Sequence, residues 1–389
     1  MRTYEKTHPW LKFQADLHGL SPSTWMALGE CQSKCEHIAR VPLRPSTAEE
    51  LYKLFLAKGI AATTAIEGNT LTEDQVRRHL DGNLEVPPSL EYQKQEIDNV
   101  LAACNRILDD VATGGGEPLS AAAIQAHNRE VLANLKLEEG VQPGQLRTHS
   151  VLVGKYRGAP AEDCEYLLDR LCQWLNGPDF RPQKGMEIAF ATLKAILAHL
   201  YIAWIHPFGD GNGRTARLVE FEILIRSGVP APAAHLPSNH YNQTRTEYYR
   251  QLDHAGRSGG EVTSFVAYAI QGFLDGLQGQ LETIWNQQWD VAWRNYVHEL
   301  FRDRGNPSQQ RQRHLVLDLS RRQEPVPMAK LPEISPRLAR AYALRTAKTL
   351  SRDVNALVRM GLLALTPKGY VARRQSILAF LPPRAKPQA

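Results

Sequence analysis

The chain has 389 residues, of which 43% are hydrophobic and 22% charged, and its formal net charge is +5. This balance excludes long disordered spans, and the length allows two or three domains with cores of their own. The charge is uneven, because residues 306–389 contain sixteen Lys and Arg against four Asp and Glu, whereas residues 1–305 contain thirty against thirty-seven. The C-terminal part is therefore predicted to expose a basic surface.

No membrane partner is expected. The N-terminus lacks an apolar signal segment, and polar residues interrupt the apolar stretch 186–205, which we interpret as a core helix. Five cysteines, an odd number without a secretion signal, favour reduced thiols and a cytoplasmic location. Cys31, Cys35 and His37 resemble part of a metal site, but no fourth ligand follows at a useful spacing, so we expect them to be structural.

Residues 1–110 are predicted to be mostly helical. Within them, Ser46-Thr-Ala-Glu49 has the pattern of a capping box and predicts a helix over 46–67 that stops at Gly68. Glu67 then lies on the last turn, where the helix dipole disfavours a negative charge by about 0.3–1 kcal/mol. We therefore expect a cation to pair with this carboxylate.

Residues 111–304 form the next predicted domain. One run in it, 143–154, has strand character and is bounded by Gly and Pro. The apolar helix 186–205 then leads into His206-Pro-Phe-Gly-Asp-Gly-Asn-Gly-Arg-Thr-Ala-Arg217, and a second helix runs over 214–226. These features predict a helix–loop–helix corner. Helices continue from 259 to about 304, where Asp303-Arg-Gly-Asn-Pro-Ser308 indicates a domain boundary.

Residues 305–389 form the last predicted domain. A helix passes through Leu315 and Leu319, another starts near Ser335, and a third is followed by Gly-Leu-Leu and two short strands around Pro367–Gly369. This order resembles a winged helix-turn-helix. Its basic charge suits DNA, whereas domains of this kind also bind proteins, including a second copy of themselves. DNA binding, protein docking and a homodimer therefore stay open as alternatives.

The glycines and arginines of the corner predict an anion site. Gly211 and Gly213 let the backbone turn freely, so that N–H groups gather at the N-terminus of the second helix, where the helix dipole adds positive potential. Arg214 and Arg217 are three residues apart and therefore lie on one face of that helix, where they can hold further phosphate oxygens. The site has room for two or three phosphates.

Two further side chains of the corner supply chemistry. Asp210 offers a hard oxygen ligand suited to a Mg²⁺ ion that bridges phosphates. His206, at the end of the preceding helix, has a side chain whose ordinary pKa suits a general base. Together with the anion site, they predict nucleotidyl or phosphoryl transfer to a hydroxyl.

The whole stretch matches, at every fixed position, the H-P-F-x-D-G-N-G-R-x-x-R signature of the Fic family, so the chain resembles a Fic-type AMP transferase. The resemblance implies a mostly α fold, with a helical core and a small β-hairpin flap, and it implies ATP as substrate with Mg²⁺. By resemblance, His206 deprotonates the target hydroxyl, Asp210 holds Mg²⁺ and Phe208 locks the loop into the core. The residues that it implies for phosphate binding are Gly211, Asn212, Gly213, Arg214 and Arg217.

A second match lies upstream. Thr63-x-x-x-Glu67-Gly68 fits the inhibitory S/T-x-x-x-E-G/N motif of Fic proteins, whose glutamate pairs with the second arginine of the signature, here Arg217. By resemblance, Glu67 keeps the γ-phosphate of ATP out of its productive position. Because the motif precedes the catalytic core, the chain is similar to the intramolecularly inhibited class.

The flap and the base pocket are also expected by resemblance. Residues 143–154 would pair with a segment of the target protein and present its hydroxyl to the catalytic histidine, although a hairpin that only covers the core is the alternative. Tyr248 and Tyr249 match a Tyr-Tyr that lines the adenine pocket in relatives, whereas aromatic residues at this spacing also occur in cores. Some relatives have an asparagine where this chain has Gly256, which makes the base specificity less secure.

The leading hypothesis is an autoinhibited enzyme that moves AMP from ATP onto a Ser, Thr or Tyr hydroxyl of a protein and releases pyrophosphate. One alternative is a Fic-fold enzyme of another transfer type, or one that removes AMP. The intact Asp-Gly-Asn-Gly-Arg sequence argues against the kinase branch of the fold. Another alternative is a DNA-binding regulator in which the Fic core only senses nucleotide.

Overall fold

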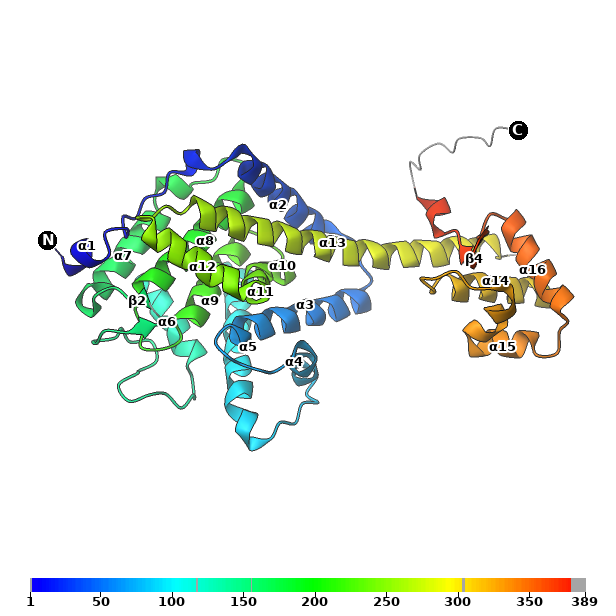
Figure 1. The fold of residues 1–389 in the computed structure, drawn as a ribbon, viewed down its shortest axis with the longest axis horizontal. Coiled ribbons are helices and arrows are strands. Elements are labelled where there is room, and N and C mark those ends of the chain that lie inside the picture. Colours follow the sequence, from blue (N-terminus) through cyan, green and yellow to red (C-terminus); the bar gives the residue numbers. More distant parts are fainter. Residues whose placement is uncertain (1, 117, 155, 303–304, 379–389) are drawn as a thin grey trace. The chain divides into compact units, whose positions relative to one another are not determined.

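The computed structural model describes residues 2–116, 118–154, 156–302 and 305–378. The chain divides into two compact units, one up to residue 281 and one from residue 282 on. As predicted, the fold is mostly α, with two small antiparallel hairpins (Figure 1).

The elements of the first unit are α1 (Thr3–Thr7), α2 (Pro22–Arg40), α3 (Pro45–Ala65), α4 (Glu73–Leu80), α5 (Glu91–Ala112), α6 (Ala121–Val131), β1 (Leu152–Val153), β2 (Tyr156–Arg157), α7 (Cys164–Leu175), α8 (Glu187–Ile205), α9 (Asn212–Arg226), α10 (Ala231–Ala234), α11 (Leu236–Gln243) and α12 (Arg245–Arg257). The helix α13 (Thr263–Leu300) begins in this unit and ends in the second. The second unit continues with α14 (Pro307–Leu319), α15 (Pro336–Tyr342), α16 (Ala347–Arg359), β3 (Leu363–Thr366) and β4 (Gly369–Ala372).

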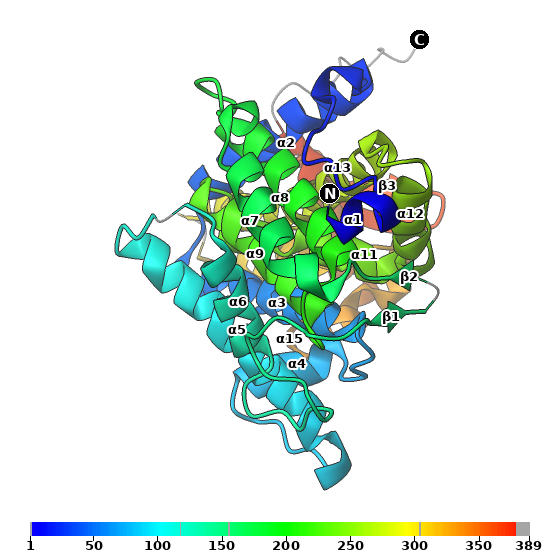
Figure 2. The ribbon, with the colours of Figure 1, turned by 90° about the vertical axis from the view of Figure 1, so that its left-hand side faces the viewer.

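The centre of the first unit is the pair α8 and α9, which pack against each other along their length (Figure 2). By length and composition α8 could cross a membrane, yet 78% of its most apolar window is buried inside the unit. It is covered by α2, α7 and α9, as expected for a core helix. All five cysteines are buried and free of disulfides, and burial raises the pKa of the Cys31 thiol to about 12, as suits a structural residue.

The helix predicted over 46–67 is α3, and its ends differ from the prediction. It begins at Pro45, with Arg44 in the N-cap position and no side-chain cap, so the expected capping box at Ser46 is wrong. Proline is favoured at the first helical position, because an N–H at that position has no acceptor within the helix and its absence costs no hydrogen bond. The helix ends at Ala65, which places Glu67 in the turn just beyond it.

The hairpin overlaps only the end of the predicted range 143–154. Its strands are β1 and β2, paired with Leu152 opposite Arg157 and Val153 opposite Tyr156. Residues 143–151 form a loop that is attached to the corner by an isolated bridge between Leu146 and Phe208. Two-residue strands carry too little periodicity to be located from the sequence, which explains the shift.

The second unit has its own core and the element order expected of a winged helix-turn-helix. Three helices, α14 to α16, precede the β3–β4 hairpin, which turns at residues 367–368. Trp293 and Val297 from α13 pack into this core with Leu315 and Val354. The unit therefore begins earlier than the boundary expected after residue 304. Residues 303 and 304, at that boundary, lie outside the described residues.

Candidate active site

The corner between α8 and α9 is held in an unusual backbone conformation. His206 caps α8 with φ 50° and ψ 58°, in the left-handed region, which non-glycine residues adopt rarely and which is common at functional sites. Gly211 follows with φ 75° and caps α9. The left-handed conformation of these two residues turns the chain and brings the histidine, the glycines and the first turn of α9 together, as the predicted helix–loop–helix corner requires.

Asparagine side chains keep the loop in this shape. Asn212 donates from its amide to the carbonyl of Phe208 at 2.8 Å and accepts the N–H of Phe208 at 2.9 Å. Asn128, on α6, is fully buried and donates to the carbonyl of Asp210 at 2.9 Å while accepting the N–H of Gly144. The side chain of Asn212 is thus a structural clamp, and only its backbone N–H is available for the predicted anion site.

Glu67 and Arg217 form an ion pair, with Nη2 of the arginine 2.5 Å from Oε1 of the glutamate. The same nitrogen donates to the carbonyl of Thr63 at 2.9 Å. The Arg217 side chain is only 1% exposed, and its Nε and Nη1 have no hydrogen-bond partner among the residues that the structure describes. Burial would raise the pKa of Glu67, but the charge and hydrogen bond of Arg217 outweigh burial and lower it. The cation expected beside Glu67 is therefore Arg217.

Two glycines make this pairing possible. A Cβ atom at Gly213 would collide with Oε1 of Glu67, so the carboxylate rests directly against the first turn of α9. Gly68 has φ +103°, a conformation that side chains disfavour, and it turns the chain immediately after the glutamate. The carboxylate thus lies where the helix dipole and the first N–H groups attract an anion.

Arg214 is tied to a carboxylate that sequence reasoning missed. Its Nη1 donates to Oε1 of buried Glu96 on α5 at 2.6 Å, and its Nη2 lies 3.3 Å from Oδ1 of Asp210. The other oxygen of Glu96 accepts the amide of Asn69 at 2.9 Å. Since Asn69 follows Gly68 in the chain, this network connects the turn after α3 to the first arginine of α9.

Arg147 was also missed, although it lies within the stretch expected to form the flap. Its guanidinium is buried and donates to the carbonyls of His206, at 2.7 Å, and of Ala159. Gly158 allows this approach, because a Cβ there would lie 3.0 Å from both the Arg147 guanidinium and the His206 side chain. The loop before the hairpin and the residues after it are thereby fastened to the catalytic corner. No sequence pattern predicts that an arginine will be buried and will donate hydrogen bonds to backbone carbonyl groups.

The surroundings of His206 shift the pKa of its ring below the working range that the sequence suggested. Burial lowers its pKa to about 4, and the charge of Arg147 adds to this, while a hydrogen bond to the backbone of Ala203 and the carboxylates of Glu67 and Asp210 oppose it. The ring is therefore neutral at neutral pH, which is the form that a general base needs.

The predicted tyrosines occupy different environments. Tyr248 is buried, and its hydroxyl lies 2.8 Å from Nε2 of His199, whose Nδ1 is 2.9 Å from Glu220. Tyr249 is 43% exposed and lies under the guanidinium of Arg245. Tyr248 thus belongs to a core hydrogen-bond network, and Tyr249 is the tyrosine of this pair that is exposed to solvent.

The part of the chain that the structure describes contains no group of three or more His, Cys, Asp or Glu side chains that could hold a metal ion. Asp210 is a single carboxylate with a side chain 45% exposed, and its hydrogen bonds to Gly211 and Arg214 both use Oδ1. A lone carboxylate of this kind suits Mg²⁺, which keeps several waters and takes its other ligands from substrate phosphates.

Comparison with known proteins finds a family match that spans this corner. Residues 118–224 match the Fic/DOC family. The protein adenylyltransferase fic-1 of Caenorhabditis briggsae is 34% identical over 212 residues, which are 54% of this chain and 38% of that protein. Its counterpart in Caenorhabditis elegans is 31% identical over 231 residues, 58% of this chain and 42% of that protein. The chain thus spans less than half the length of these relatives.

Solved structures agree on the fold. Fic-1 from Caenorhabditis elegans aligns with a TM-score of 0.54 and 26% identity, over 68% of this chain and 74% of that one. A Fic family protein from Desulfovibrio desulfuricans G20 aligns with a TM-score of 0.55 and 21% identity, over 91% of this chain and 96% of that one. The second alignment shows a shared fold over nearly the whole chain, including its C-terminal part.

The low pKa of His206 can be measured directly. We expect the ring carbon signal of His206, followed by NMR, to titrate with a midpoint near pH 4 instead of the ordinary 6.5, because the buried site disfavours the charged ring. The variant His206→Asn identifies the signal. A midpoint between 6 and 7 would show that the ring is not desolvated as described.

The Glu67–Arg217 pair also predicts a stability change. Glu67→Ala leaves the buried guanidinium with the Thr63 carbonyl alone, so we expect the free energy of unfolding to fall by about 1–3 kcal/mol. The folded-state pKa of Glu67 lies below its ordinary 4.5, so this contribution is present above about pH 4.5 and is lost as the pH falls through the folded-state value. Thermal unfolding at pH 7 measures the loss, with Glu85→Ala, at an exposed loop position, as the matched control. Equal melting temperatures for the two variants would contradict the assignment.

Proposed function

We propose that this protein, whose residues 118–224 are a Fic domain, is an autoinhibited protein adenylyltransferase. It would move AMP from ATP onto a Ser, Thr or Tyr hydroxyl of a target protein and release pyrophosphate. The observation that carries the proposal is the contact of Glu67 with Arg217 and Gly213, on the same corner that presents a neutral His206.

The chemistry follows from the positions of these groups. His206 would take the proton of the target hydroxyl, whose oxygen then attacks the α-phosphorus, and the bond to pyrophosphate breaks. The first N–H groups of α9, at Asn212 to Arg214, lack partners within the helix and would hold the α-phosphate, together with Gly211, whose N–H now donates to Asp210. Arg214 and Arg217 would bind the β- and γ-phosphates, since Nε of both, and Nη1 of Arg217, are buried without partners.

In the proposed inhibition, the carboxylate of Glu67 and the γ-phosphate of ATP would compete for the guanidinium of Arg217. The carboxylate of Glu67 holds Arg217 and lies against the N-terminus of α9, where a γ-phosphate would meet a like charge. ATP could then bind only in an unproductive position. Release requires Glu67 to leave, and the turn around Gly68 is the short segment that would have to move.

Asp210 is the residue that would hold Mg²⁺, in line with its exposed single carboxylate. When bound with ATP, the ion would neutralise charge on the phosphates and help to orient them. The ligand set would be complete only with the nucleotide present, which accounts for a site with one protein carboxylate.

The β1–β2 hairpin supports docking of a target segment. Leu152 and Val153 on β1 are 64% and 42% exposed, and a short edge strand with exposed apolar side chains is suited to pairing with an extended peptide. The hairpin is fastened to the corner through Arg147 and through Tyr156, whose hydroxyl donates to the carbonyl of Trp204 at 2.6 Å. A docked hydroxyl would thus be presented to His206. A cytoplasmic location remains our proposal, in line with the free cysteines.

A second candidate function, DNA binding, is favoured by α16. Its apolar face is buried through Leu350, Val354 and Leu357. A surface hollow on its opposite side is lined by Thr346, Lys348, Thr349, Ser351, Arg352, Asn355 and Arg359. Cations and hydroxyls along one helix suit phosphate backbones. Arg374, which follows β4, covers the Trp289 ring and lies 3.8 Å from Asp290, so it is engaged elsewhere.

The transferase proposal predicts a gain of activity from one substitution. Glu67→Gly frees Arg217 for the γ-phosphate, so AMP incorporation should rise by roughly tenfold or more over wild type. Mass spectrometry of the modified protein, including self-modification, measures the transfer and separates AMP from other groups. The control is His206→Ala in the same background, which should abolish transfer while ATP binding persists. Equal turnover by wild type and Glu67→Gly would exclude the inhibitory role.

The DNA proposal is tested on the full chain. Lys348→Ala with Arg352→Ala should weaken binding to a duplex and reduce the slope of log affinity against log salt by about two. Arg250→Ala with Arg257→Ala removes two exposed cations from α12 and should change neither. If wild type shows no affinity for duplex DNA at about 50 mM salt, the C-terminal unit is a docking or dimerisation module, and sedimentation of the full chain then separates monomer from homodimer.

A further inference from the structure

A basic pocket lies within the C-terminal unit, between the second half of α13, α14 and the start of α15. Its volume is about 240 Å³. The cationic and imidazole side chains that line it are Arg294 and His298 from α13, Arg313 and His314 from α14, Arg321 just after α14, and Arg337 from α15. The pocket includes no residue of α16, β3 or β4.

The positive charge of the pocket is mostly uncompensated. Among the residues that the structure describes, Arg294, Arg313 and Arg321 make no ion pair. The carboxylate in the wall is Asp290, which lies 3.8 Å from Arg374. Several guanidinium groups gathered without counter-charges repel one another and disfavour the compact state. A bound anion would relieve this repulsion.

One of the arginines is held in a fixed orientation. Nε of Arg337 donates to Oδ2 of Asp318 at 2.7 Å, and Nη2 pairs with Oδ1. Asp318 has a side chain only 6% exposed, and it also accepts the hydroxyl of Ser335 at 2.5 Å. The Arg337 side chain itself remains 42% exposed. A buried carboxylate that orients an accessible guanidinium is the arrangement expected of a preorganised anion site.

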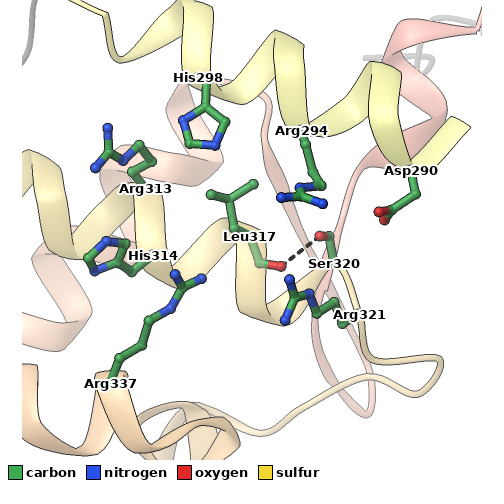
Figure 3. A pocket seen from close by; sticks show the side chains of 9 residues that line it. All are labelled: Asp290, Arg294, His298, Arg313, His314, Leu317, Ser320, Arg321 and Arg337. Carbon is green, nitrogen blue, oxygen red and sulfur yellow. Dashed lines mark hydrogen bonds between the residues drawn. The ribbon is translucent and has the colours of Figure 1, made fainter. Parts of the chain in front are cut away.

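The other donors face the same space. Figure 3 shows the guanidinium groups of Arg294 and Arg321 directed toward each other beside Ser320, with Leu317 between this pair and the two histidines. Burial lowers the pKa of His314, and the charges of Arg337 and Arg313 lower it further. The neutral ring then offers an N–H donor without adding to the repulsion.

We propose that this pocket binds a compact, multiply charged phosphate anion, of the size of a diphosphate or of the polyphosphate end of a small molecule. Guanidinium forks match phosphate oxygens in geometry as well as charge. The volume is below the roughly 300–1,000 Å³ of sites that enclose a drug-sized ligand, which favours the small anion. The concave shape distinguishes the pocket from the extended helix face of α16. The proposal does not depend on the transferase activity.

The test is calorimetric titration of the full chain with inorganic pyrophosphate and, separately, with orthophosphate. We expect Arg294→Ala with Arg321→Ala to remove one pyrophosphate site, or to weaken it roughly tenfold or more, and orthophosphate to bind more weakly than pyrophosphate. Arg294→Lys with Arg321→Lys keeps the charge but loses the forks, so it should restore affinity only in part. The matched control, Arg250→Ala with Arg257→Ala, removes two exposed cations from α12 and should retain the site.

Binding at the α9 corner contributes equally to all these variants and cancels in the comparison. Both arginines of the first variant are exposed, so folding should survive, and circular dichroism checks this. Equal stoichiometry and affinity in wild type and in Arg294→Ala with Arg321→Ala would overturn the proposal. It would also be overturned if the pocket variant lost duplex DNA affinity as fully as the α16 variant while pyrophosphate binding stayed unchanged, because the cations would then serve a nucleic-acid backbone.

Discussion

The buried guanidinium of Arg217 is the constraint on which the site depends. A charge that is 1% exposed cannot be hydrated, so the fold must supply a partner. Here the partner is the carboxylate of Glu67, brought by the turn after α3, and two nitrogens of the guanidinium still lack acceptors. The ion pair stabilises the buried charge, but the guanidinium group does not make all the hydrogen bonds that it could make. Under the proposed function, a polyphosphate that fills the same space would compete for Arg217, so inhibition and substrate binding would have a common physical origin.

The loop between α8 and α9 is held in place by hydrogen bonds from buried side chains, which do not depend on the Glu67–Arg217 pair. The loop carbonyls of Phe208, Asp210 and His206 are each held by a buried side chain, from Asn212, Asn128 and Arg147 respectively. Such clamps keep the base and the helix N-terminus in register, so that little reorganisation is needed when substrate binds. The turn at Glu67 is held differently, through a carboxylate one third exposed. A firmly held site beside a partly exposed carboxylate agrees with the regulation that we propose.

Sequence patterns predicted the structure correctly where the residues that determine it lie close together in the chain. The helices α8 and α9 and the loop between them were predicted nearly to their ends, because apolar runs and a glycine-rich turn act over a few residues. The start of α3 was misjudged because Pro45 at the first helical position outweighed the capping pattern at Ser46. The hairpin was misplaced because the register of two-residue strands is decided by attachments to the corner, among them Arg147.

The sequence by itself determined the residue types and their spacing in the signature and in the Thr63–Gly68 motif, and hence the class of chemistry that we propose. Only the tertiary structure decided which long-range partners the charges find. Glu96 on α5 accepts a hydrogen bond from Arg214, although 118 positions separate the two residues. A single glutamate in a helix gives no sequence pattern from which this pairing could be predicted. The arginines of α13, α14 and α15 likewise form a pocket only after three helices pack together. Burial and pairing of charges are properties of the packed chain, because a side chain loses its water only when distant segments close over it.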